Sequence, residues 1–94
     1  HPEPAEDDPD SAETLRQTIA QVVEEEPGVC DMHGLTILRS GERISASFHC
    51  RMHPDTPITL AHERTNALEA ALRTRLPQLV RVTIHMEPDE SRPS

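Results

Sequence analysis

The chain has 94 residues, a formal net charge of −8, and nine basic residues, all of them arginine. Its length fits one small domain, and a single Phe with no Trp or Tyr predicts a thin, aliphatic core. The acidic balance argues against nucleic acid and anionic lipid as ligands, because both bind basic patches, and no apolar run approaches the roughly 20 residues of a membrane span.

The first ten residues, HPEPAEDDPD, are rich in proline and acids and are typical of a disordered or linker-like lead. Asp10 and Glu13 match a capping box, so a helix is expected over 11–26. Pro27 and Gly28 end it. Apolar residues recur there at helical spacing, namely Leu15, Ile19, Val22 and Val23.

Residues 29–52 predict a β-hairpin that turns at Ser40-Gly41-Glu42. In a three-residue loop, the numbers of opposed residues sum to 82, and a slip of one residue would scramble the apolar face. The pairs expected toward the helices are Leu38 with Ile44, Thr36 with Ala46, Gly34 with Phe48, and Met32 with Cys50. The pairs expected on the outer face are Ile37 with Ser45, Leu35 with Ser47, His33 with His49, and Asp31 with Arg51.

A second helix is predicted to start at Thr56-Pro57, with Thr56 as the N-cap, and to end before Pro77. Its apolar stripe consists of Leu60, Ala61, Leu68, Ala71, Leu72 and Leu76. A last strand over 79–87 alternates between its faces. Val80, Val82, Ile84 and Met86 are expected on the inner face, and Arg81, Thr83, His85 and Glu87 on the outer face.

The order α-β-β-α-β predicts an α+β fold, a ferredoxin-like open-faced sandwich with a three-stranded sheet and two helices on one face. We expect the domain to cover 11–88, after the lead over 1–10 and before a flexible tail over 89–94. The sequence begins at His1 rather than Met, which predicts a processed chain or a fragment of a larger protein. Two cysteines make no disulfide framework, so a reducing, cytoplasmic setting is expected.

The second and third strands are joined through a helix, so we expect them to be parallel and adjacent. His49 then lies on the middle strand, with His33 on one side and His85 and Glu87 on the other. A single histidine on a strand is more often a plain surface residue. Three beside a carboxylate indicate a metal site, because this is a normal zinc set and charged imidazoles would repel one another without a cation.

Other possible donors carry weaker signals. His62 lies early in the second helix, where plain surface packing is as probable as metal binding. His53 follows His49 by four residues and would lie on the same face if the strand continued, but Pro54 is expected to end the strand. Cys30 and Cys50 fall on the core face, where a free cysteine packs as a small hydrophobe.

The residues also match a known pattern. It comprises Val29 with His33-Gly34-Leu35, His49 within a strand-turn-strand, Ala61-His62, and a closing Ile84-His85-Met86-Glu87-Pro88. Over about 11–88 the chain resembles the C-terminal cytoplasmic domain of cation diffusion facilitator transporters. The chain departs from the family pattern at two positions. Glu87 stands where some members have Asp, and Gly34 replaces an Asp that is common after the first histidine. Both differences bear on which metal binds and on how many ions bind.

The resemblance implies that His33, His49, His62, His85 and Glu87 bind divalent metal, with more than one ion per subunit possible. Zn²⁺ is expected, or another ion such as Cd²⁺, Co²⁺, Ni²⁺, Mn²⁺ or Fe²⁺. The resemblance also implies a V-shaped homodimer that closes on metal and lies on the cytoplasmic side of the membrane. Closure would favour transport by the membrane domain of the same chain. Leu35 and Ile37, expected on the outer face, would add apolar area to such an interface.

Three classes of function follow. The leading one is a metal-sensing regulatory and dimerisation domain of a cation efflux transporter. The alternative is a stand-alone soluble homologue that carries or buffers metal. An enzyme that uses the metal as a Lewis acid is not expected, because the sequence offers no separate general base, Gly-rich phosphate loop or nucleophile elbow.

Overall fold

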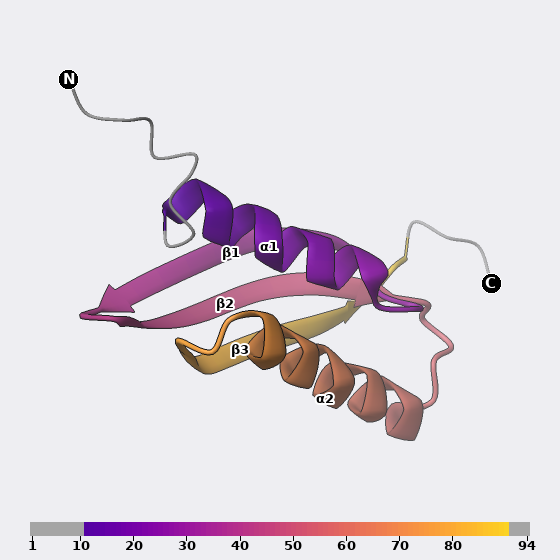
Figure 1. The fold of residues 1–94 in the computed structure, drawn as a ribbon. Coiled ribbons are helices and arrows are strands. Elements are labelled where there is room, and N and C mark those ends of the chain that lie inside the picture. The colour runs from indigo at the N-terminus through magenta and orange to yellow at the C-terminus, as the bar shows by residue number, and fades with distance from the viewer. Residues whose placement is uncertain (1–10, 91–94) are drawn as a thin grey trace.

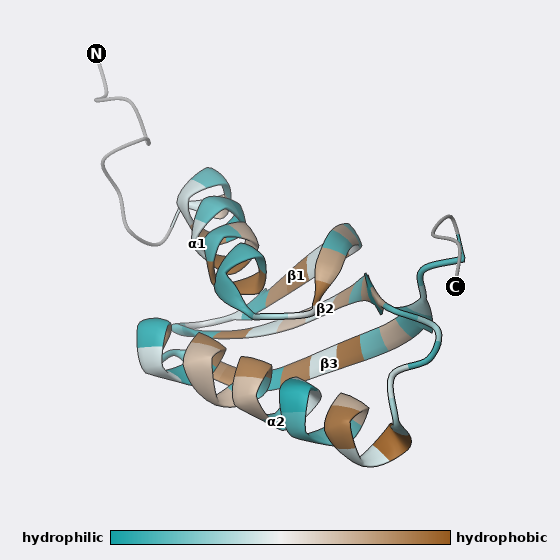
Figure 2. Cartoon of the chain, turned by 90° about the vertical axis from the view of Figure 1, so that its right-hand side faces the viewer, coloured by the Kyte–Doolittle hydropathy of each residue, from teal (hydrophilic) through white to brown (hydrophobic). Residues whose placement is uncertain are grey.

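The computed structural model describes residues 11–90, which follow the predicted α-β-β-α-β order (Figure 1). The elements are α1 (Ala12–Glu25), β1 (Cys30–Ser40), β2 (Arg43–Met52), α2 (Ile58–Arg75) and β3 (Leu79–Pro88). The sheet order is β1-β2-β3, with β2 antiparallel to β1 and parallel to β3. Both helices cover one face of the sheet, so the ferredoxin-like fold is confirmed (Figures 1 and 2).

The core lies between the helices and the inner face of the sheet. Hydrophobic segments of α1 and α2 turn toward the strands (Figure 2). Phe48, the single aromatic residue, is completely buried there. The same buried cluster includes the aliphatic residues Leu15, Ile19, Val22, Val23, Ile44, Leu68 and Leu72. The predicted thin, aliphatic core is therefore confirmed. No helix within residues 11–90 has the length and apolar character needed to span a bilayer.

Both helix starts differ from the prediction. The hydroxyl of Ser11 accepts a hydrogen bond from the Thr14 backbone N–H and caps α1, whereas the predicted cap, Asp10, lies outside the described residues, as does the lead over 1–10. The predicted cap of α2 is wrong. Thr56 donates its hydroxyl hydrogen to the His53 carbonyl, which closes a turn before the helix, and Pro57 takes the N-cap position without a side-chain bond.

The hairpin turn is shorter than predicted. Ser40 pairs with Arg43, so the loop contains only Gly41 and Glu42, and Gly41 has a φ of +62°. A glycine at positive φ suits a two-residue turn, whose twist matches that of the strands. The numbers of opposed residues sum to 83 here, as in the pairs Ile37 with Ala46, Leu38 with Ser45, and Thr36 with Ser47.

This register reverses the predicted faces of β1 near the turn. Leu35 and Ile37 pack against the core, while the Leu38 side chain is 66% exposed. The predicted pairs in this segment, and the assignment of Leu35 and Ile37 to the outer face, are therefore wrong. The outer face near the turn instead carries small polar side chains beside Leu38, among them Thr36, Ser45, Ser47 and Thr83.

Irregularities in β1 then change the pairing twice. The first lies beside Gly34, whose φ is +64°, and beyond it His33 pairs with His49 as predicted. A bulge inserts one unpaired residue, and a glycine in the left-handed region is a common occupant. The second lies near Asp31, which has a φ of +56°. Cys30 rather than Asp31 then pairs with Arg51, so that predicted pair is wrong by one residue.

The start of β3 contains a further irregularity. Ile44 pairs with Leu79 and Ser45 with Arg81, so Val80 is the extra residue and is 52% exposed. Its predicted place on the inner face is wrong, and Leu79 is buried instead. Beyond this point the predicted alternation holds, because Val82 is buried and Ile84 and Met86 pack against the core. The folded part continues past Pro88, since Asp89 is only 6% exposed and donates its backbone N–H to the Met52 carbonyl.

Candidate metal centre

Three histidines form a row across the sheet. His33 on β1 pairs with His49 on β2, and His49 pairs with His85 on β3. The His33 and His49 rings stack with centroids 5.3 Å apart, and the His49 and His85 rings with centroids 4.7 Å apart. The predicted juxtaposition of these histidines follows directly from strand order and register.

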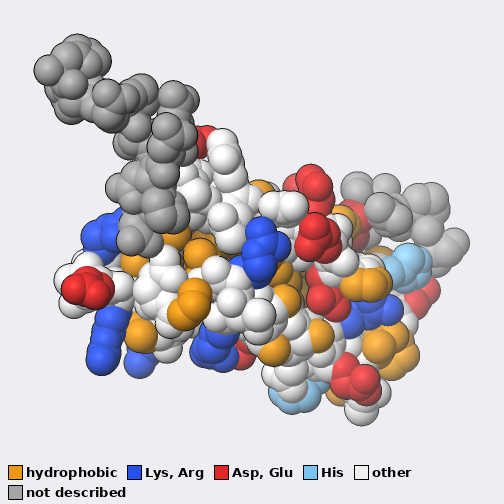
Figure 3. Space-filling model, in the orientation of Figure 1, with side chains coloured by type: hydrophobic (Ala, Val, Ile, Leu, Met, Phe, Trp, Pro, Cys, Tyr) orange, Lys and Arg blue, Asp and Glu red, His pale blue; other side chains and the backbone are white. Residues whose placement is uncertain are grey.

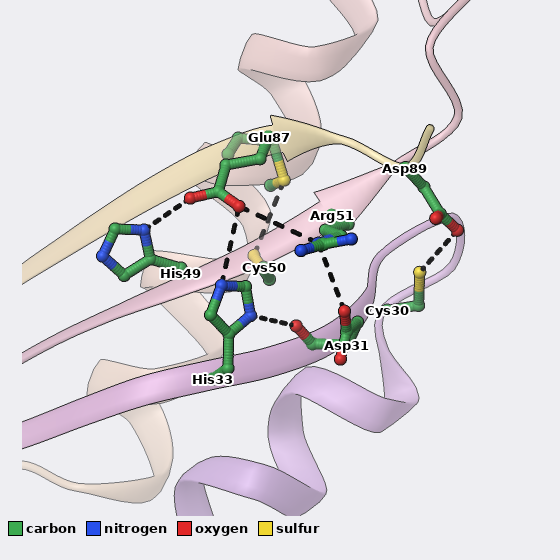
Figure 4. Close-up of polar contacts among 9 residues, drawn as sticks. Cys30, Asp31, His33, His49, Cys50, Arg51, Glu87 and Asp89 are labelled. Carbon is green, nitrogen blue, oxygen red and sulfur yellow. Dashed lines mark hydrogen bonds and ion pairs between the residues drawn. The ribbon is translucent and has the colours of Figure 1, made fainter. Parts of the chain in front are cut away.

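Glu87 brings a carboxylate to the first two histidines (Figure 4). Its Oε2 lies 2.6 Å from His49 Nδ1, and its Oε1 lies 3.5 Å from His33 Nε2. One donor atom from each of the three residues lies within 4.8 Å of the others. The side chains are 36–41% exposed, so the group lies at the surface and is open to ions from solvent.

The tautomer of His33 suits metal binding. Its Nδ1 lies 2.9 Å from the Asp31 carbonyl oxygen, which can only accept, so Nδ1 carries a proton. In the neutral form of the ring, the lone pair therefore lies on Nε2. That lone pair faces Glu87 Oε1, which is also an acceptor. Two acceptors at this separation are stabilised by a proton or a metal ion between them, so the residues present fit a divalent cation. A histidine that ligates a metal commonly donates its other N–H to a carbonyl in this way.

Glu87 is held in its ionised form. The hydrogen bond from His49 lowers the pKa of the Glu87 carboxyl, and the nearby His49, His33 and Arg51 act in the same direction, while partial removal from water opposes them. A lowered pKa in the folded protein gives stability that is present above the ordinary carboxyl range and is lost as the pH falls through the lowered value. Glu87 therefore keeps its charge throughout the range in which free imidazole titrates.

We accordingly expect zinc affinity to fall when the pH is lowered from about 7.5 to about 5.5, because protons compete for imidazole nitrogens, which titrate near about 6.5 in model peptides. The expected loss approaches tenfold per pH unit for each histidine that must lose a proton. Calorimetric titration with zinc at the two pH values measures it. An unchanged affinity would indicate ligands other than histidine, since Glu87 does not titrate in this range.

Residues 12–89 match the family described as the cytoplasmic domain of cation efflux proteins. The chain belongs to this family. A curated relative, the cation-efflux pump FieF of Pectobacterium atrosepticum, is 33% identical over 72 residues. These residues are 77% of this chain and 24% of the pump, so the chain spans about a quarter of that relative's length.

Solved structures of cation efflux domains share the fold. The metal-bound C-terminal domain of the CzcD transporter from Thermotoga maritima is 27% identical, with a TM-score of 0.76 over 79% of this chain and 86% of that one. The cytosolic domain of another cation diffusion facilitator family protein is 26% identical, with a TM-score of 0.76 over 81% of this chain and 90% of that one. The MamM C-terminal domain, at 23% identity, has a TM-score of 0.77 and supports the fold alone.

The remaining predicted donors of this cation efflux domain lie outside the group of three. His85 stacks on His49 without joining it. His62 is exposed on α2, which packs against the opposite face of the sheet. His53 is exposed beyond the end of β2, and its Nδ1 accepts a hydrogen bond from the Asp55 backbone N–H. The structure therefore brings together three of the five predicted donors within residues 11–90.

The cysteines of the domain are both free thiols. Cys50 is buried on the inner face, as predicted, with its Sγ 3.5 Å from Met86 Sδ. Burial, followed by the charges of Cys30 and Glu87, raises the pKa of the Cys50 thiol to about 11. Cys50 therefore stays protonated at neutral pH, which does not suit a metal ligand. Cys30 is half-buried and lies 3.7 Å from Asp89 Oδ2.

Proposed function

We propose that this chain is the metal-sensing regulatory domain of a divalent-cation efflux transporter and binds zinc or a similar ion at His33, His49 and Glu87. The observation that carries the proposal is the convergence of their donor atoms within 4.8 Å. Membership of the cation efflux family supports it. The metal-bound structure of the related CzcD domain also supports it. The proposed role is binding rather than catalysis.

The donor set favours particular ions. Imidazole with carboxylate suits zinc, cobalt, nickel and cadmium, and manganese less well. We propose His85 as a further ligand, because its ring already stacks on that of His49. His62 lies on the far side of the sheet, so it can join the site only if a second copy of the chain presents it.

We further propose that the domain is a homodimer whose subunits close on metal, and that closure promotes transport by a membrane domain of the same chain. The outer face of the sheet carries the half-exposed metal group and the exposed Leu38. Without an ion, carboxylates brought together by closure repel one another, and a divalent ion reverses this repulsion. The difference in the ion's affinity for the closed and open forms determines how far the population moves.

Small-angle scattering tests this proposal. We expect a dimer with and without zinc, and a smaller radius of gyration at saturating zinc that returns to its starting value on chelation. Zinc should produce the same contraction in a His53→Ala variant, because His53 lies outside the metal group. A monomer in both states would refute the proposed dimer, and a dimer whose radius does not respond to zinc would refute metal-driven closure.

A further inference from the structure

Arg51 places a permanent positive charge beside the metal group. On β2 it pairs with Cys30 of β1 and with Glu87 of β3. Its Nε lies 3.2 Å from Asp31 Oδ2 and 3.8 Å from Glu87 Oε1 (Figure 4). Guanidinium is not deprotonated in proteins, so this charge persists at every pH at which the fold exists.

The contacts of Arg51 leave it shared between two carboxylates. Its Nε is inaccessible to solvent and has no hydrogen bond of good geometry, although both carboxylate oxygens lie within ion-pairing distance. The guanidinium is therefore attracted to both Glu87 and Asp31, and its Nε donates a hydrogen bond to neither of them. A metal ion that binds Glu87 leaves Arg51 with Asp31 as its remaining partner.

The charges of Asp31, Glu87 and Arg51 determine how strongly the site attracts a cation. With neutral imidazoles, Asp31 and Glu87 contribute two negative charges and Arg51 one positive charge, so the net charge is −1. We propose that Arg51 acts as an internal cation that lowers the affinity of this site for divalent metal, and that Asp31 limits this effect by holding the guanidinium. This inference rests on the proposed metal-binding function. It gives Arg51 a role in setting the free metal concentration at which the site becomes occupied.

The size of the effect follows from partial exposure. Arg51 and Glu87 are each 36% exposed, so solvent screens the repulsion between the guanidinium and the ion. A unit charge several ångströms from a divalent ion in such surroundings changes affinity by about three- to tenfold. We therefore expect an Arg51→Gln variant, which keeps most of the side-chain stem, to bind zinc about three- to tenfold more tightly than the parent.

Two further variants separate charge from shape. Arg51→Lys keeps the charge and should bind zinc within about twofold of the parent. Asp31→Asn removes the partner of Arg51 and should weaken binding by about three- to tenfold. Asn tolerates the left-handed backbone found at Asp31, and the backbone carbonyl that holds His33 remains. The double variant that combines Arg51→Gln with Asp31→Asn should return toward the parent affinity, because the net charge of the group is again −1.

Calorimetric titration measures the zinc affinity of the parent, the three single variants and the double variant. The titrations are made at about 50 mM and about 500 mM salt, because screening at high salt should reduce the differences in affinity. Circular dichroism verifies that each variant is folded. The inference would be overturned if Arg51→Gln bound zinc no more tightly than the parent, or if Arg51→Lys bound zinc as tightly as Arg51→Gln does. In either case, zinc binding by the parent would still support the proposed function. If neither the parent nor any variant bound zinc, the proposed function itself would fail, and this inference with it.

Discussion

Replacement of His49 by alanine is expected to weaken zinc binding by about 100-fold or more, because the variant loses a ligand at the centre of the group. His49 stacks on the rings of both His33 and His85. Its Nδ1 also holds Glu87 Oε2 at 2.6 Å. The substitution therefore removes one donor and releases the carboxylate that the ion needs. Calorimetric titration with zinc measures the loss.

The matched control is His53→Ala, which removes the same type of side chain just beyond the same strand. His53 is exposed and belongs to no group of three metal donors within residues 11–90, so zinc affinity should stay within about twofold of the parent. The His49 side chain is 40% exposed, so its removal leaves no large internal cavity and the variant should remain folded. Parental affinity in a folded His49→Ala variant would contradict the proposed site.

Replacement of Phe48 by alanine is expected to lower the free energy of unfolding by about 3–5 kcal/mol. Phe48 is completely buried and is the only aromatic residue in the chain. It pairs with Ile84 and directly precedes His49, so the core and the metal group share the same segment of β2. Small domains are marginally stable, with about 5–15 kcal/mol in total, and this variant should lose much of that margin. Urea unfolding measures the change.

Leu38→Ala provides the comparison for Phe48→Ala. Leu38 lies on the same sheet but is 66% exposed, so its truncation should change the free energy of unfolding by no more than about 0.5 kcal/mol. Equal losses in the two variants would mean that Phe48 is not the centre of the core. A loss of less than about 1 kcal/mol for Phe48→Ala would contradict the burial seen in the structure.

The sequence predicted the metal group better than it predicted the hairpin that carries it. A three-residue loop was expected, and the actual loop has two residues. The bulge beside Gly34 adds one unpaired residue to β1, which offsets the missing loop residue. His33 therefore pairs with His49 as predicted, although Leu35 and Ile37 turn to the opposite face from the one expected.

The sequence does contain signs of the bulge in β1. Once β1 is divided at Gly34, the pair Leu35 and Ile37 is more apolar than Thr36 and Leu38, which favours burial of the former. A glycine inside a strand pattern is also a known sign of a bulge. The irregularity at Val80 carries no such sign, because residues 79–82 contain neither glycine nor proline. The irregularity leaves Leu79 buried and Val80 exposed.

The sequence placed Asp31 and Arg51 on the same face, but it did not predict the backbone contacts of Asp31. Asp31 holds His33 through its backbone carbonyl, a group that every residue possesses, so no side-chain pattern reports it. The positive φ of Asp31 accompanies that contact and the one-residue shift that pairs Arg51 with Cys30. Such backbone detail depends on tertiary packing, and only the folded chain shows which carbonyl meets which ring.

Because the donors of the proposed metal site come from all three strands, metal binding would be coupled to the stability of the fold. His49 and Glu87 are 38 residues apart in sequence, and Glu87 lies in the last strand, so the complete group forms only after β3 has been synthesised and has joined the sheet. An ion bound at the proposed site would favour the native state, in which the donors converge, over the unfolded chain. At a free metal concentration 100 times the dissociation constant, it would add about 2.7 kcal/mol to the free energy of unfolding. Proteases act on opened chains. A cell rich in the metal would thus retain the domain longer, and a depleted cell would degrade it sooner.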